Sequence, residues 1–355
     1  MRPRSIHNCN VDWFRKLRGG SALCYRKALI PLMDENPKRA MEHLLSEAPS
    51  WYLFGYCHIH MHWLGRRYSN RVDLEHIGTV GDSACGSGFV HGVIETRVKR
   101  DPAGFTREMI DNLCEGTSPT WIQQHSCEHA IGHKIMYGLR QNQPAALEQC
   151  RRLAEGGDRF LRNCTSGVFM ENITAPFRED AAKLSKRFDK KHPTRMCDGM
   201  PKWSLRMCYV DVQENLPVRN VVRLCEQIEK RGIDASSCYR STMRVLMNED
   251  DDDKYNWSRL CSHRPECAYQ HAVSFGLPPI DVEALVRHCE RGKVPFDEKL
   301  RPYCAEGAGY IAATKAPREH AADIVTTMCP MFTQANMQRA CRRGASMPDD
   351  AIDWM

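Results

Sequence analysis

Three short stretches of this chain each place two metal-binding side chains four residues apart. The pairs are His58 and His62, His91 and Glu95, and His129 and His133. Side chains four residues apart lie on the same face of an α-helix, one turn above each other. Imidazole is the commonest neutral metal ligand at physiological pH, and zinc, copper and iron all accept it. Three neighbouring helices are therefore predicted to present two-ligand faces.

A repeat in the sequence aligns two of these faces. His91 and His133 each lie six residues after a repeated cysteine, Cys85 and Cys127 respectively. In an array of stacked repeats, equivalent positions lie one above the next at helix-packing distances of about 8–10 Å. Side chains from such positions can converge on one ion. The glycines beside these histidines, at 92 and 132, are expected to leave room beside the rings.

These observations predict a transition-metal centre that binds zinc, copper or iron. The predicted ligands are His58, His62, His91 and His133. His129 and Glu95 are predicted to be further ligands or to orient an imidazole, and Glu95 is also a candidate catalytic carboxylate. Glu171, one place after the equivalent position in the next repeat, is a candidate general base. A histidine centre with an open position suits a metal-dependent hydrolase or oxidase.

The cysteines indicate the scaffold that carries these side chains. Eight of them open similar stretches, and the first and last are 256 residues apart over seven intervals, a mean of about 37. The eight are Cys85, Cys127, Cys164, Cys208, Cys238, Cys267, Cys304 and Cys341. A period in this range is typical of helical hairpins. A small residue lies three places after six of these cysteines, which allows a neighbouring helix to come close.

A second cysteine ends an apolar helical stretch before most of the repeated ones. The repeating unit therefore reads as helix, cysteine, loop, cysteine, helix, and pairing neighbours within each unit is the economical choice. The predicted bonds join residues 9–24, 57–85, 114–127, 150–164, 197–208, 225–238, 261–267, 289–304 and 329–341. These nine bonds use all 18 cysteines. No C-x-x-C occurs, which disfavours zinc ribbons and iron–sulfur clusters.

The predicted fold is all-α, an α-solenoid of about eight disulfide-stapled helical hairpins. Residues 1–50 are predicted to form an N-terminal helical cap, with Asn36 as an N-cap and Pro37 at the first helical position. Residues 51–175 form the histidine-rich repeats with the metal site. Residues 176–355 form further cysteine-stapled repeats and a C-terminal cap. Asn142 with Pro144, Pro217 and Pro279 are start signals of later helices.

Eighteen cysteines in 355 residues favour an oxidising compartment, so a periplasmic or extracellular location is expected. The first thirty residues contain no apolar run typical of a signal peptide, which conflicts with that expectation. The sequence contains no stretch of about 18 apolar residues, so no membrane span is predicted.

The net charge is +6, from 50 basic and 44 acidic residues. The sequence contains no basic stripe with interleaved aromatic residues, which disfavours nucleic-acid binding. Walker A, G-x-S-x-G and H-E-x-x-H motifs are absent. His271 and His288 stand alone in the sequence and are interpreted as structural or solvated. The oligomeric state is not predicted.

Architecturally, the chain resembles secreted cysteine-rich Sel1-type repeat proteins, without their alanine-rich consensus. Histidine-bearing helical repeats are also similar to the HEAT-type deoxyhypusine hydroxylase, whose His-Glu dipeptides are absent here. Neither resemblance assigns a family. Two hypotheses remain. The first is an exported metalloprotein with a histidine centre. The second is a non-catalytic scaffold whose concave face binds a protein or peptide and whose histidines are incidental.

Overall fold

A computed structural model gives the architecture of most of the chain. The structure describes residues 20–47, 57–72, 84–97, 104–117, 121–174, 189, 192–213, 218–230, 232, 235–236, 238–239, 264–275, 281–292, 296–315 and 321–346. Within these ranges every regular element is helical and no strand occurs. The all-α prediction is therefore confirmed for the described part of the chain.

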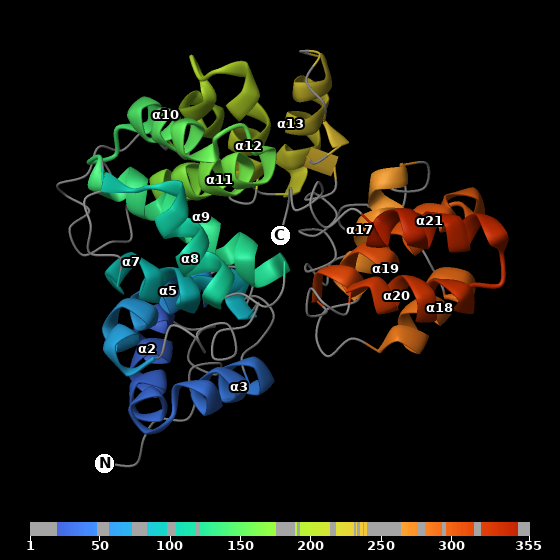
Figure 1. The fold of residues 1–355 in the computed structure, drawn as a ribbon, viewed down its shortest axis with the longest axis horizontal. Coiled ribbons are helices and arrows are strands. Elements are labelled where there is room, and N and C mark those ends of the chain that lie inside the picture. Colours follow the sequence, from blue (N-terminus) through green and yellow to red (C-terminus); the bar gives the residue numbers. More distant parts are fainter. Residues whose placement is uncertain are drawn as a thin grey trace.

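The helices fall into two groups along the chain (Figure 1). The first group comprises α2 (Gly20–Glu35), α3 (Pro37–Glu47), α5 (Cys57–Tyr68), η2 (Ser69–Arg71), η4 (Ala84–Ser87), α7 (Gly88–Arg97), α8 (Arg107–Thr117), α9 (Trp121–Gly138), α10 (Gln143–Ala154), α11 (Asp158–Thr174), η8 (Pro193–Cys197), α12 (Lys202–Gln213) and α13 (Val218–Lys230). The second comprises α17 (Pro265–Phe275), α18 (Val282–Arg291), η9 (Glu298–Leu300), α19 (Arg301–Lys315), α20 (Ala321–Thr327), η11 (Cys329–Met331) and α21 (Ala335–Ala345).

Disulfides join neighbouring helical elements at the predicted cysteine pairs within the described ranges. Seven of the nine predicted bonds are present: 57–85, 114–127, 150–164, 197–208, 225–238, 289–304 and 329–341. The predicted bonds of Cys9 and Cys261 involve residues outside the described ranges. Six of the seven bonds span 11 to 15 residues and one spans 28. Seven disulfides are typical of a protein from an oxidising environment.

Helix starts follow the capping signals in the sequence. The Asn36 side chain accepts a hydrogen bond from the Arg39 backbone N–H at the start of α3. Asn142 accepts from the Ala145 N–H at the start of α10. Each of these bonds satisfies a backbone donor that the helix leaves open. At α18 the cap is Asp281, which accepts from the Ala284 N–H and which the sequence reading had not singled out.

Glycine lets consecutive second helices of the hairpins pack backbone to backbone. A Cβ at Gly88 would meet the carbonyl oxygen of His58, and one at Gly167 would meet that of His129. In the second group, a Cβ at Gly344 would meet the carbonyl of Glu306 on α19. The predicted role of the small residue after the repeated cysteine is therefore confirmed at these three positions.

The two glycines beside the metal-candidate histidines have a different role from the expected one. A Cβ at Gly92 would meet the His62 carbonyl oxygen, and one at Gly132 would meet that of Cys164. A neighbouring helix backbone therefore fills the space that was expected to lie open beside the rings. A glycine on a buried helix face allows the backbone of a neighbouring helix to pack against it, so no open space remains there.

The buried apolar side chains of the described residues form two clusters. One runs from Tyr25 to Tyr239 and the other from Ala268 to Cys341. In the first group, α5 contacts α7, α7 contacts α9, α9 contacts α11 and α11 contacts α12. In the second group, α17 contacts α19 and α19 contacts α21. This order is the one expected of stacked hairpins, while the solenoid as a whole and the boundaries at 50 and 175 stay predictions.

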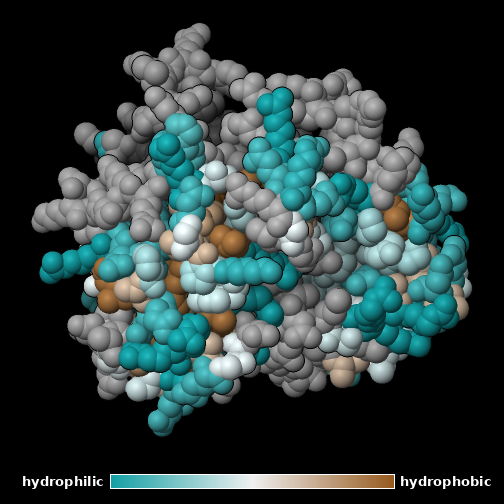
Figure 2. All heavy atoms as spheres, turned by 90° about the horizontal axis from the view of Figure 1, so that it is seen from above, coloured by the Kyte–Doolittle hydropathy of each residue, from teal (hydrophilic) through white to brown (hydrophobic). Residues whose placement is uncertain are grey.

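The described surface is mainly hydrophilic on the face in Figure 2, with hydrophobic side chains in small spots. Large apolar side chains exposed within the described ranges are Trp203, Tyr303 and Met331. None of the described helices combines the length and apolarity needed to cross a bilayer.

The substitution Gly167→Ala tests the backbone contact. The added methyl must displace α11 from the His129 carbonyl on α9, so we expect the free energy of unfolding to fall by about 1–3 kcal/mol. Gly104→Ala is the control, because nothing lies within 4 Å of that position. Denaturant unfolding followed by circular dichroism measures both. Equal stability of the two variants would contradict the packing described here.

Candidate metal centre

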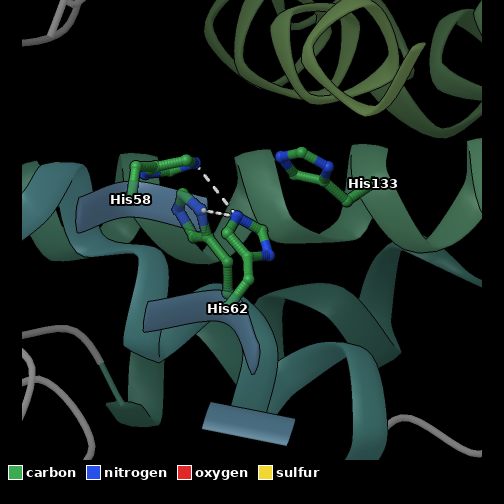
Figure 3. Close-up of side chains that lie close together, drawn as sticks. His58, His62 and His133 are labelled. Carbon is green, nitrogen blue, oxygen red and sulfur yellow. Dashed lines mark hydrogen bonds between the residues drawn. The ribbon is translucent and has the colours of Figure 1, made fainter. Parts of the chain in front are cut away.

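Three helices bring the predicted ligands together. Helix α5 carries His58 and His62, α7 carries His91, and α9 carries His133. Figure 3 shows His133 extending from α9 beside the two histidines of α5. His62, His91 and His133 are buried, and His58 is partly buried. Helices α5 and α9 are joined through α7, which contacts both.

The histidine rings of the centre are in direct contact. The Nε2 atoms of His58 and His62 lie 3.0 Å apart, and His91 Nδ1 lies 3.3 Å from His62 Nε2. The ring centroids of His62 and His133 are 4.9 Å apart. Ligand nitrogens of a tetrahedral zinc site with bonds of about 2.0–2.1 Å lie roughly 3.3 Å from each other. The closest nitrogen pairs therefore already have a spacing typical of a shared ion.

Three of the four ligand rings, those of His58, His62 and His133, are anchored through Nδ1. His58 Nδ1 donates to the backbone oxygen of Cys85 at 2.9 Å. His62 Nδ1 donates to Glu95 Oε1 at 2.8 Å, and His133 Nδ1 donates to Glu171 Oε2 at 2.9 Å. Metal-binding histidines almost always have such a carboxylate or carbonyl behind them, because it fixes the tautomer and the ring orientation.

These anchors decide where the ring protons lie. Carbonyl and carboxylate oxygens only accept, so the proton of each neutral ring is on Nδ1 and Nε2 carries a lone pair. Burial lowers the pKa of His62 to about 4, and burial with repulsion from His62 and His133 holds the pKa of His58 well below its usual value. Both rings are neutral at pH 7, and their Nε2 lone pairs face each other. A cation between them would remove that repulsion.

His129 extends the cluster on α9. Its ring stacks on His91, with centroids 4.8 Å apart, and its Nε2 lies 3.1 Å from His133 Nε2. Burial, with repulsion from neighbouring imidazoles, holds the pKa values of His91 and His129 well below the usual range. Among the described residues, His91 Nε2 and His129 Nδ1 are buried without a hydrogen-bond partner. Such nitrogens are costly unless a ligand or ion satisfies them.

Two overlapping groups of these side chains could hold a metal ion. In the first, His58, His62, His91 and His133 each offer an atom within 4.8 Å of every other. In the second, Glu95, His133 and Glu171 do the same. His129, the fifth predicted ligand, contacts both His91 and His133 of the first group and belongs to neither group. Glu95 and Glu171, predicted as catalytic or orienting carboxylates, lie behind the ligand rings.

Two residues that shape the site, Cys85 and Gln141, were not predicted from the sequence to be part of it. Cys85 has a left-handed backbone with φ of 54°, and its carbonyl anchors His58. Gln141, at φ of 63°, donates from Nε2 to Glu171 Oε1 at 3.0 Å. Non-glycine residues with such φ values cost energy and gather at functional sites. Cys85 was identified from its spacing only as a repeated cysteine, and Gln141 was not identified at all, because both contribute to the site through the backbone conformation at their positions.

The reading of His271 and His288 as isolated residues is wrong. His288 Nε2 lies 2.8 Å from His271 Nδ1, and the rings are stacked with an interplanar angle of 4°. The residues are 17 apart in the sequence and meet because α17 and α18 contact each other. Within the described ranges they form a pair separate from the metal-candidate groups.

Comparison with known protein families, curated proteins and solved structures finds no match to this chain. The functional conclusions below therefore depend on the geometry of the site itself.

The paired histidines in the second helix group predict a pH dependence of stability. Burial lowers the pKa of His271 to about 4 from 6.5. Below pH 6.5 the His271 side chain binds a proton in the unfolded chain, whereas in the folded protein it does so only near pH 4. The free energy of unfolding therefore falls as the pH drops through that window, by up to about 1.4 kcal/mol for each pH unit.

Urea unfolding at pH 7.5, 6 and 5, compared between the wild type and His271→Gln, measures this contribution. The variant is expected to lose stability less steeply toward pH 5 than the wild type. Identical pH slopes would show that His271 titrates in the folded protein as it does in the unfolded chain.

Proposed function

We propose that this protein is an exported metalloprotein that binds a transition-metal ion at His58, His62, His91 and His133. One observation carries the proposal. Two neutral imidazoles, each anchored through Nδ1, direct their Nε2 lone pairs at each other across 3.0 Å. A packed core histidine normally uses its nitrogens in hydrogen bonds, whereas lone pairs facing across this distance are the arrangement of a binding site. Periplasmic or extracellular location is part of the proposal and follows from the disulfides.

The carboxylates support this proposal as positioning groups. Glu171 is fully buried and accepts hydrogen bonds from His133 and Gln141. Glu95 accepts from His62 and Arg66. A carboxylate behind a ligand imidazole raises the basicity of the ring and strengthens metal binding. The role of Glu171 as a general base stays a prediction, and its burial favours the positioning role.

Bound metal would determine the chemistry of the site. Zinc at histidine ligands activates water for hydrolysis, whereas copper and iron activate dioxygen for oxidation. The residues of this chain would hold the ion, exclude bulk water from its buried side and keep the rings in one tautomer. The alternative of a non-catalytic scaffold stays a prediction. Within the described ranges, the exposed large apolar side chains are Trp203, Tyr303 and Met331, which lie on three different elements.

Elemental analysis of protein purified without a histidine tag tests the proposal. We expect about one ion of zinc, copper or iron per chain in the wild type. The double variant His62→Ala, His133→Ala is expected to lose it. The matched control is His271→Ala, His288→Ala, which removes two contacting histidines from the other helix group and should keep the metal. Wild-type protein that stays empty after incubation with each of the three metals would refute the proposal.

Replacing a carboxylate behind a ligand tests the anchoring. Glu171→Gln keeps the shape of the side chain and removes its charge, so we expect metal affinity to fall by about 10–100-fold. Competition with a chelator measures the affinity. Glu148→Gln is the control, because Glu148 is exposed on α10 and pairs with Arg151. Unchanged affinity in Glu171→Gln would remove this carboxylate from the site.

A further inference from the structure

His129 and His133 repeat the contact that carries the proposed metal site. Their Nε2 atoms lie 3.1 Å apart on α9, as those of His58 and His62 lie 3.0 Å apart on α5. Both contacts arise from the same spacing, because side chains four residues apart lie on one face of a helix, one turn above each other. The cluster therefore contains two pairs of imidazoles in Nε2-to-Nε2 contact.

Within the described part of the chain, no tautomer of His129 satisfies both of its nitrogens. His133 donates from Nδ1 to Glu171, so its Nε2 carries a lone pair. If His129 has its proton on Nε2 it can donate to His133, but its Nδ1 lone pair is then buried without a partner. If the proton is on Nδ1, that N–H has no acceptor and the two Nε2 lone pairs face each other. Burial in this state costs free energy, which a cation bound by the pair can offset.

The two pairs are adjacent but distinct. The ring centroids of His62 and His133 are 4.9 Å apart, and those of His91 and His129 are 4.8 Å apart. His91 Nδ1 lies 3.3 Å from His62 Nε2, so His91 joins the first pair through this nitrogen while its ring stacks on the second. Ions in two-metal sites lie about 3.5–4 Å apart. One ion at each pair fits this spacing.

The metal-binding side chains are more numerous than one ion requires. A zinc ion in a protein has four ligands in most sites. The described cluster contains five histidines and two carboxylates from α5, α7, α9 and α11: His58, His62, His91, His129, His133, Glu95 and Glu171. Each carboxylate offers an oxygen within 4.8 Å of a His133 nitrogen, so an oxygen ligand lies close to the second pair.

We propose that the centre binds two transition-metal ions. His58, His62 and His91 hold the first ion, and His129 and His133 hold the second together with a carboxylate oxygen. When the second ion binds, it takes His133 from the first, which keeps three histidines and gains an open position for water or substrate. Two adjacent ions can stabilise both the attacking and the leaving oxygen of a displacement reaction, as in metal-dependent hydrolysis. The inference rests on the proposed metal centre and adds His129 to its ligands.

Metal stoichiometry in the full-length protein tests the second ion. Because that ion has fewer histidine ligands, we expect purified protein to retain about one ion and to bind about two after dialysis against zinc. His129→Gln keeps a polar side chain of similar size and loses the imidazole, so it should bind only about one. The matched control is His125→Gln, one turn earlier on α9. His125 is also buried, but its Nδ1 is hydrogen-bonded to Asn163, so this variant should still bind both ions.

Copper(II) loading provides a second measurement that needs no variant. Two copper(II) ions about 3.5–4 Å apart couple magnetically. The electron paramagnetic resonance signal of the loaded wild type should therefore account for fewer spins than the copper bound. In His129→Gln each bound copper should contribute one full spin.

These outcomes distinguish the second ion from the metal centre itself. A wild type that binds no metal refutes both proposals. A wild type that binds one ion after dialysis leaves the metal centre in place and overturns the second ion. The second ion is also overturned if His129→Gln binds two ions, or if two bound copper ions in the wild type show no coupling.

Discussion

Close backbone contact between neighbouring helices is the constraint on which this structure depends. Gly88 and Gly92 on α7 lie against the backbone carbonyls of His58 and His62, and Gly167 on α11 lies against that of His129. The contacts fall on the same residues whose imidazoles form the candidate centre. Because no side chain separates the helices there, rings that project beside the contact can reach one another. The packing of the backbone and the geometry of the site are therefore one feature.

The disulfides and the loops hold this packing in place. Six of the seven described bonds close short loops of 11 to 15 residues. Each of these raises the free energy of unfolding by about 2–3 kcal/mol, because it restricts the unfolded chain. Such reinforcement matters because the site itself opposes folding. Neutral imidazoles face each other through lone pairs, and Cys85 and Gln141 adopt left-handed backbone conformations beside them. A rigid scaffold can sustain arrangements that a loosely packed one would relax.

Two carboxylates support the rings of the candidate centre from behind. Glu171 accepts a hydrogen bond from His133 Nδ1. Glu95 accepts hydrogen bonds from His62 and from Arg66. Negative charge behind ligand imidazoles favours the binding of a cation on their other side.

The sequence by itself determined the helical hairpins, seven disulfide pairs and the caps at Asn36 and Asn142, because these depend on local spacing and on the repeat. It also aligned His91 with His133 by their equal distance from a repeated cysteine. Only the tertiary structure decided which nitrogen each ring directs inward and the pairing of His271 with His288. Those features arise where separate helices and loop backbones contact each other, and the periodicity of the sequence does not predict such contacts.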